Sequence, residues 1–222
     1  MSHKSGMIKP LKWYDNMITK KQLKILEVFR ENIFREYSYK EIGQRAKEKS
    51  NNTLQKAIRQ FLKEKIVIEK KVGTSKLYSI NTENEKVYDY LALLKFEGLP
   101  KEVAYSIKEL IKEIEEYTLF YSLVIFGSYA DGKYTNKSDL DVCILIPEKS
   151  LEKDIKIALN MASNKSLLKL DPYIFTLDEF LQMLKDKSEN LGKQIARKHK
   201  AIQNINIFYK FVKKGMENGF KY

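Results

Sequence analysis

Apolar positions in the first third of the chain recur with the spacing of amphipathic helices. In residues 20–34 and 37–49 apolar side chains return every three or four positions, which predicts two helices. Ser50 is a suitable N-cap for a third helix over residues 51–65. Residues 66–80 instead alternate in two runs, joined by a Val-Gly-Thr-Ser turn, which predicts a β-hairpin.

This order of elements resembles the winged helix-turn-helix family. The resemblance implies that the helix from Asn51 enters a DNA major groove and that the hairpin contacts backbone phosphates. An alternative is a dimerisation or protein-docking module, because no single residue here is diagnostic. The candidate nucleic-acid contacts, for DNA or RNA, are polar and basic side chains that suit phosphates and base edges: Asn52, Gln55, Lys56, Arg59 and Lys63 on the helix, and Lys70, Lys71 and Lys76 on the hairpin.

The rest of the chain alternates helices with strands. Residues 82–100 fit a helical connector that ends in Gly-Leu-Pro. Beyond it we predict helices over 101–119, 150–163, 177–190 and 200–218, and strands over 122–127, 139–146 and 168–176. Such alternation predicts an α+β fold in which helices flank a small mixed sheet.

One stretch of this half, LVIFGSYADGKYTNKSDLDVCILI, combines buried-strand patterns with carboxylates. Asp139 and Asp141 are two residues apart and therefore project from the same face of a strand. Two neighbouring carboxylates repel each other unless a cation lies between them. Oxygen ligands favour a hard divalent ion, Mg²⁺ or Mn²⁺.

Gly127 and Ser128 stand at the end of the preceding strand. Glycine allows the backbone to approach a phosphate closely, and backbone N–H groups and the serine hydroxyl can donate hydrogen bonds to it. A phosphate-binding turn beside metal-binding carboxylates predicts in-line attack on the α-phosphate of a nucleoside triphosphate.

The motif Phe-Gly-Ser, ten residues, then Asp-Leu-Asp resembles the signature of the DNA polymerase β-like nucleotidyltransferases, particularly the minimal members. The likeness covers roughly residues 101–190. It implies a third carboxylate from a later strand, as metal ligand or as base, and Asp171 is the candidate. The alternative for Asp171 is a turn residue before Pro172, whereas Asp178 and Glu179 suit the start of a helix.

The resemblance also implies a nucleotide substrate, for which we expect ATP, and transfer of a nucleoside monophosphate to an acceptor hydroxyl with release of pyrophosphate. We assign Lys137 and Ser138, with Gly127 and Ser128, to the nucleotide site. Many members carry Arg where this chain has Asp131, a change that Lys133 or Lys137 could compensate. The acceptor stays open: a nucleic-acid end, a protein hydroxyl or a small molecule.

Four segments follow from these patterns. We expect a flexible leader over 1–19, a winged helix-turn-helix over 20–81, a connector over 82–100 and a nucleotidyltransferase domain with C-terminal helices over 101–222. Two other functions remain open. The chain could be a DNA-binding regulator that only senses nucleotide, or one half of a toxin–antitoxin pair with a helical partner protein. A homodimer is equally compatible.

Composition narrows the picture. Of the net charge of +12 over 222 residues, +9 lies in residues 1–100, so a polyanion is expected to meet that half; the alternative is a merely solubilising surface. One cysteine, Cys143, excludes an internal disulfide and reads as a core residue. With only His3 and His199, a histidine-rich metal site is excluded, and His199 reads as part of an exposed basic cluster. No apolar run long enough to span a membrane and no signal peptide are present, so we expect a cytoplasmic protein.

Overall fold

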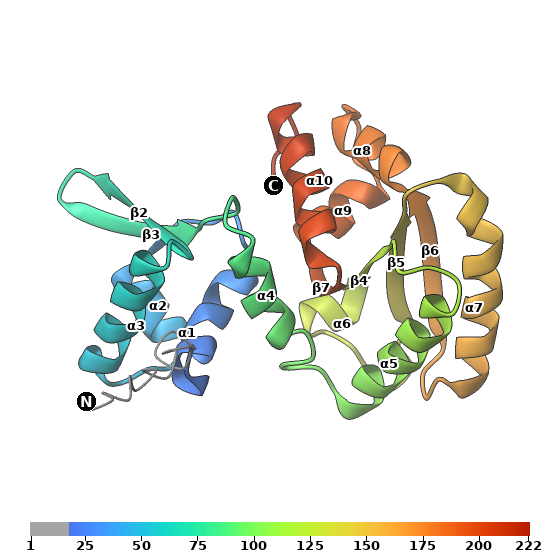
Figure 1. Ribbon diagram of the computed structural model, residues 1–222, viewed down its shortest axis with the longest axis horizontal. Coiled ribbons are helices and arrows are strands. Elements are labelled where there is room, and N and C mark those ends of the chain that lie inside the picture. The colour runs from blue at the N-terminus through green and yellow to red at the C-terminus, as the bar shows by residue number, and fades with distance from the viewer. Residues whose placement is uncertain (1–17) are drawn as a thin grey trace, which may run out of the picture. The chain divides into compact units, whose positions relative to one another are not determined.

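A computed structural model describes residues 18–222 and divides the chain into two units between Asn81 and Thr82 (Figure 1). The leader expected over residues 1–19 lies outside the described residues, apart from residues 18 and 19, and so does His3. The segment 82–100 belongs to the second unit.

The first unit combines helices with a small antiparallel sheet of strand order β1-β3-β2. Its elements are α1 (Lys20–Arg30), β1 (Tyr37–Ser38), α2 (Tyr39–Arg45), α3 (Asn51–Lys63), β2 (Val67–Val72) and β3 (Ser75–Ile80). The predicted hairpin is confirmed, since Val72 pairs with Ser75 at its turn. Ser50 caps α3 as predicted, because its hydroxyl accepts a hydrogen bond from the Thr53 amide (3.3 Å).

The three helices of this unit are shorter than predicted: α1 ends at Arg30, α2 spans Tyr39–Arg45 and α3 ends at Lys63. The helix expected over 37–49 begins only at Tyr39, because Ser38 and Glu41 form a capping box that fixes its start. The two residues before it form β1, which is too short to show any periodicity in the sequence. The buried faces of the three helices meet in the core, with Phe29, Ile42 and Phe61 fully buried.

The second unit is built on a mixed sheet of strand order β6-β5-β4-β7. β5 runs parallel to β6, whereas β4 is antiparallel to both β5 and β7. Its elements are α4 (Lys86–Leu93), α5 (Lys101–Glu115), β4 (Ser122–Phe126), α6 (Gly127–Asp131), β5 (Leu140–Ile146), η2 (Lys149–Leu151), α7 (Glu152–Lys165), β6 (Leu170–Thr176), α8 (Leu177–Lys185), α9 (Leu191–Arg197), β7 (His199–Gln203) and α10 (Ile205–Glu217).

Helices flank this sheet on both faces, as the alternation predicts. α5 and α7 pack together over one face, and α8 and α10 pack together over the other (Figure 1). β5 lies in the interior of the sheet and is buried at every position from Val142 to Ile146. Cys143 is a buried core residue, as predicted, and burial raises the pKa of its thiol.

Three elements of the second unit were not predicted. α6 occupies the first half of the expected loop between β4 and β5. The helix expected over 177–190 ends at Lys185, and a separate helix, α9, follows. The helix expected over 200–218 is wrong at its start, because residues 199–203 form β7. Five residues with mixed polarity carry no clear period, and it is the pairing of β7 with β4 that makes them a strand.

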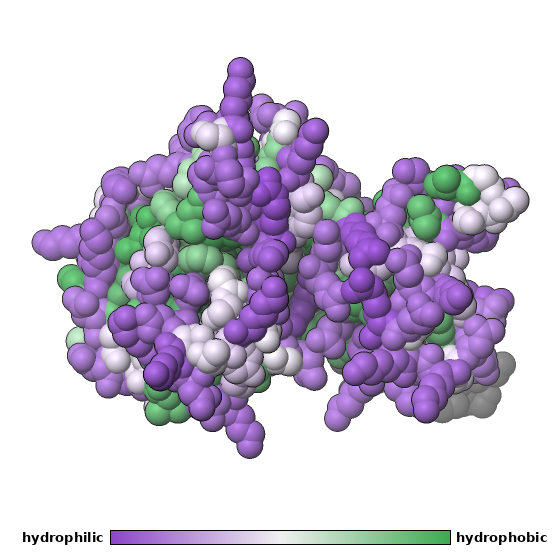
Figure 2. All heavy atoms as spheres, turned by 180° about the vertical axis from the view of Figure 1, so that it is seen from behind, coloured by the Kyte–Doolittle hydropathy of each residue, from purple (hydrophilic) through white to green (hydrophobic). Residues whose placement is uncertain are grey.

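Among residues 18–222, no helix combines the length and the hydropathy needed to cross a membrane. Hydrophilic side chains cover most of the face shown in Figure 2.

Candidate active site

Three aspartates come together at the ends of neighbouring strands. Asp139 directly precedes β5, and Asp141 is the second residue of that strand. In the parallel pairing of β5 with β6, Asp141 lies directly opposite Asp171. Strand register therefore brings Asp171 to the pair that the sequence singles out.

The electrostatics of this cluster reflect crowded negative charge. Burial, followed by the charges of Asp171 and Asp139, raises the pKa of Asp141 above that of an ordinary aspartate. The ammonium of Lys169 lies 2.6 Å from Asp139 Oδ2 and offsets part of this charge. The same bond raises the pKa of Lys169.

The donor set suits a hard divalent cation. All three side chains offer carboxylate oxygens, and their mutual repulsion is the kind that a bound cation relieves. In the described part of the chain, no group of three or more aspartate, glutamate, histidine or cysteine side chains is arranged so that it could hold a metal ion. In this arrangement Asp139 instead pairs with Lys169.

Gly127 is fixed by its contact with Asp141. Its φ of +64° lies in the left-handed region, and a Cβ at this position would lie 2.1 Å from Asp141 Oδ2. Only glycine fits both conditions. The turn that leaves β4 therefore lies directly against the second aspartate of the cluster.

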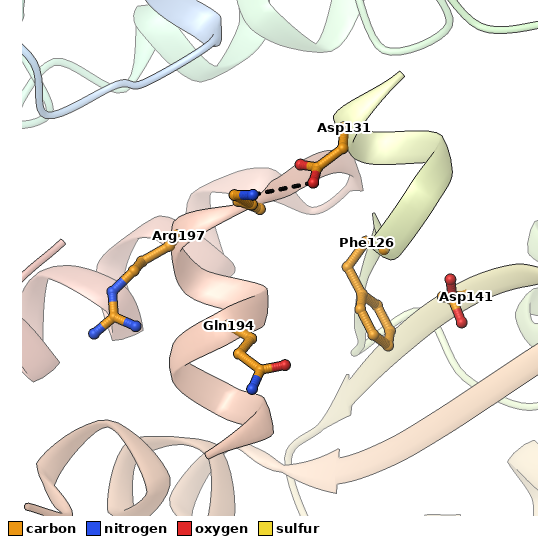
Figure 3. Close-up of a pocket in the computed structure, with 7 residues that line it drawn as sticks. Phe126, Asp131, Asp141, Gln194 and Arg197 are labelled. Carbon is orange, nitrogen blue, oxygen red and sulfur yellow. Dashed lines mark hydrogen bonds and ion pairs between the residues drawn. The ribbon is translucent and has the colours of Figure 1, made fainter. Parts of the chain in front are cut away.

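A cavity of about 450 Å³ opens beside this contact. Figure 3 shows Phe126, Asp131 and Asp141 on one side and Gln194 and Arg197 across from them on α9. Gly127 and Lys198 complete the lining. Strong charges of both signs thus face the same space next to the carboxylate cluster.

The cations of this cavity come from a part of the chain that the sequence did not assign to the site. Lys198 Nζ lies 3.1 Å from Asp131 Oδ2 (Figure 3). Among residues 18–222, the lysine that pairs with the negative charge of Asp131 is therefore Lys198, not Lys133 or Lys137. Arg197 is oriented by Glu189, at 2.8 and 2.9 Å. The one sequence signal for these cations is the basic run Ala-Arg-Lys-His-Lys at residues 196–200.

Two of the residues assigned to the nucleotide site, Lys137 and Ser138, do not line this cavity. Ser138 accepts a hydrogen bond from the Thr135 amide (2.9 Å) and closes a turn. Lys137 is exposed in that same turn. Neither lines the cavity, whereas Gly127 does. Ser128 follows Gly127 in α6 and is partly exposed.

Tyr173 is a further residue that the sequence did not suggest. It follows Asp171 by two positions on β6, and its hydroxyl donates a hydrogen bond to Asp171 Oδ2 (3.2 Å). This bond is the main cause of the raised pKa of Tyr173. The ring packs edge-on against Phe126, with centroids 5.5 Å apart, so it lies next to a residue that lines the cavity.

The expectation that His199 belongs to an exposed basic cluster is wrong. Its ring packs against Phe208, and its two nitrogens bond to the Ile195 carbonyl and the Tyr209 hydroxyl, each at 3.1 Å. Burial lowers the pKa of His199 to about 4, so the ring is neutral at pH 7 and adds no charge to the cavity wall.

The candidate nucleic-acid contacts of the first unit lie on exposed surface. All five on α3 are exposed: Asn52, Gln55, Lys56, Arg59 and Lys63. On the hairpin, Lys70 pairs with Glu36 and Lys76 pairs with Glu69, each at 2.9 Å. Lys71 is exposed between them. Internal ion pairs thus neutralise part of the hairpin charge and leave the charge of α3 facing solvent.

Comparison with known proteins identifies the class of the second unit. The sequence profile of the nucleotidyltransferase domain matches residues 107–213, from within α5 to within α10. A Methanocaldococcus jannaschii protein with the provisional name protein adenylyltransferase is 33% identical over 100 residues, which cover 42% of this chain and 99% of that relative. The chain belongs to the nucleotidyltransferase family.

Proposed function

We propose that the protein transfers AMP from ATP to a hydroxyl group of a protein, with Mg²⁺ or Mn²⁺ held by Asp139, Asp141 and Asp171. The observation that carries the proposal is the pairing of Asp141 with Asp171 beside the Gly127 turn. The name of the archaeal relative supports adenylyl transfer and a protein acceptor.

We assign the roles of the residues from the triphosphate side of the site, at Gly127, to the acceptor side, at Asp171. The Gly127 backbone and the Ser128 hydroxyl bind the triphosphate, which occupies the cavity near the ammonium of Lys198. When bound, the divalent ion would neutralise part of the negative charge of the phosphates. Asp171 lies on the side of the cluster away from Gly127 and accepts the proton of the acceptor hydroxyl.

ATP labelled at the α-phosphate tests this function. Incubated with Mg²⁺ and a protein extract, the wild-type chain should transfer label to protein and release pyrophosphate. Asp139→Asn with Asp141→Asn should abolish both, whereas Asp178→Asn, an exposed aspartate at the start of α8, should change neither. Nucleotide binding with no pyrophosphate release would favour the alternative of a nucleotide-sensing regulator.

We further propose that the first unit is a winged helix that binds nucleic acid. The exposed basic face of α3, next to an antiparallel hairpin, supports this role. Lys56→Ala, Arg59→Ala and Lys71→Ala together should weaken binding to duplex DNA and lower its salt dependence by about one unit of log–log slope per lost phosphate contact.

A triple variant of exposed lysines on α1, Lys20→Ala, Lys21→Ala and Lys24→Ala, removes the same charge from another surface. It should bind DNA more tightly than the variant of α3 and the hairpin. Equal losses in the two variants would indicate a non-specific effect of net charge and would argue against the winged-helix role.

A further inference from the structure

We propose that Tyr173 is itself an acceptor of the adenylyl group, so that the protein modifies its own active site. This inference rests on the proposed function. It starts from a hydroxyl group of the chain, that of Tyr173, which lies within hydrogen-bonding distance of Asp171, the proposed base.

The position of Tyr173 follows from strand geometry. Residues two apart on a strand project from the same face, so Tyr173 and Asp171 share one side of β6. The tyrosine hydroxyl donates to Asp171 Oδ2 at 3.2 Å, which is within the reach that proton transfer to a base requires. No main-chain rearrangement is needed to bring these two groups together.

A continuous set of contacts joins this hydroxyl to the nucleotide side of the site. Tyr173 contacts Asp171, which lies opposite Asp141, and Asp141 lies against the Gly127 turn. The ring of Tyr173 also packs on Phe126, which lines the cavity. An α-phosphate bound at the carboxylate cluster would therefore lie close to the hydroxyl oxygen of Tyr173.

The proposed step balances with ATP as the only co-reactant. The Tyr173 oxygen forms a bond to the α-phosphorus, and the bond from that phosphorus to the bridging oxygen of pyrophosphate breaks. The phenolic proton passes to Asp171, and pyrophosphate leaves with the electron pair of the broken bond. The product is a tyrosyl-AMP phosphodiester on β6. The attached AMP would fill the approach to Asp171, so the modification should block transfer to any other acceptor.

This modification can be detected without knowing the physiological acceptor. The purified full-length chain is incubated with ATP and Mg²⁺ or Mn²⁺ and analysed by intact mass and peptide mapping. We expect one added AMP per chain, located on Tyr173, at a rate constant that does not change on dilution because the acceptor is in the same chain. Asp139→Asn with Asp141→Asn should prevent the addition.

Tyr173→Phe keeps the ring that packs on Phe126 and removes only the hydroxyl, so it should lose the label. Tyr134→Phe is the matched control, because Tyr134 is an exposed tyrosine that stacks on Tyr129. It should keep the label. Peptide mapping of the wild-type chain locates the AMP independently, even where a variant fails to fold.

The outcomes separate this inference from the proposed function. Label transferred to extract proteins, with Tyr173 unmodified in the wild-type chain, would overturn self-modification and leave the function standing. AMP on a different residue, or a rate constant that rises with protein concentration, would overturn it as well. Failure of pyrophosphate release with every acceptor would overturn both.

Discussion

The most constrained single residue of the site is Gly127. Two independent conditions require glycine there. Its backbone has a positive φ, which residues other than glycine rarely adopt, and Asp141 lies against the position that a Cβ atom would take. The close contact between the backbone of the turn and the Asp141 carboxylate depends on the absence of one methyl group at position 127. A side chain at position 127 is therefore expected to disturb both the turn and the Asp141 carboxylate beside it.

Gly127→Ala should therefore destabilise the protein and abolish AMP transfer. Gly132→Ala is a matched control, because Gly132 has a similar φ of +70° but no atom within 4 Å of its Cβ position. The free energy of unfolding of the control should fall by about 1 kcal/mol, from backbone strain alone. That of Gly127→Ala should fall by about 1–3 kcal/mol more, because the new methyl group also meets Asp141. Urea denaturation measures the difference, and equal losses would mean that the Asp141 contact is unimportant.

Asp141 is held at a cost to stability when no cation is bound. Since its pKa is raised in the folded state, its contribution to the free energy of unfolding falls as pH rises past the usual pKa of an aspartate. At pH 7 the ionised side chain therefore destabilises the metal-free fold. A carboxylate under such repulsion is suited to bind a cation.

Asp141→Asn should raise the melting temperature of the metal-free protein at pH 7. Allowing for solvent screening, we expect a gain of about 0.5–1 kcal/mol, or about 1–4 °C. Added Mg²⁺ should stabilise the wild-type chain and have little effect on the variant. Thermal unfolding with a chelator and then with Mg²⁺ checks this; a lower melting temperature for the variant in chelator would contradict it.

Among the elements, α9 positions the side chains that line the cavity opposite Phe126 and Asp141. It is a short helix whose position depends on the loop that joins it to α8. Lys193 is a buried lysine, 7% exposed, and its ammonium donates to the main-chain carbonyls of Asp186 and Ser188. The buried charge is thereby satisfied by the loop that it holds in place.

Lys193→Met should destabilise the second unit by about 2–4 kcal/mol, because two carbonyl groups lose their donor. It should also weaken ATP binding, since Gln194, Arg197 and Lys198 lie on or next to this helix. Lys187→Met, an exposed lysine of the same loop, should change neither property by more than about 0.5 kcal/mol. Urea unfolding and ATP titration of both variants provide the measurement.

In the whole molecule, two units divide the proposed tasks. The aspartate cluster, the cavity and the core between β4, β5, α5 and α7 all lie within residues 82–222. The exposed basic face of α3 lies within residues 18–81. The excess positive charge is concentrated in the first half of the sequence.

The fragment 82–222 should retain AMP transfer and lose salt-dependent binding to nucleic acid. We expect its transfer rate on protein acceptors to stay within about threefold of the full chain, a difference of about 0.7 kcal/mol in activation free energy. A filter-binding titration at two salt concentrations checks the second part. Unchanged DNA affinity in the fragment would contradict this prediction and would mean that the second unit binds the nucleic acid.

Local patterns in the sequence were enough to predict most of the elements and the first two aspartates. Period and capping residues defined α3 and its hairpin, and the Asp-Leu-Asp spacing on a buried strand marked Asp139 and Asp141. The same patterns missed β7, whose five residues are a strand only because they pair with β4. Local propensity cannot report such a pairing.

The remaining features of the site depend on contacts between distant parts of the chain. The register of β5 and β6 sets Asp171 opposite Asp141, and the fold brings Lys198 to Asp131, 67 positions earlier in the sequence. Tyr173 becomes a candidate acceptor only once its hydroxyl is seen against Asp171. Sequence periodicity fixes which face of an element a side chain takes, but only tertiary packing decides which other side chain it meets.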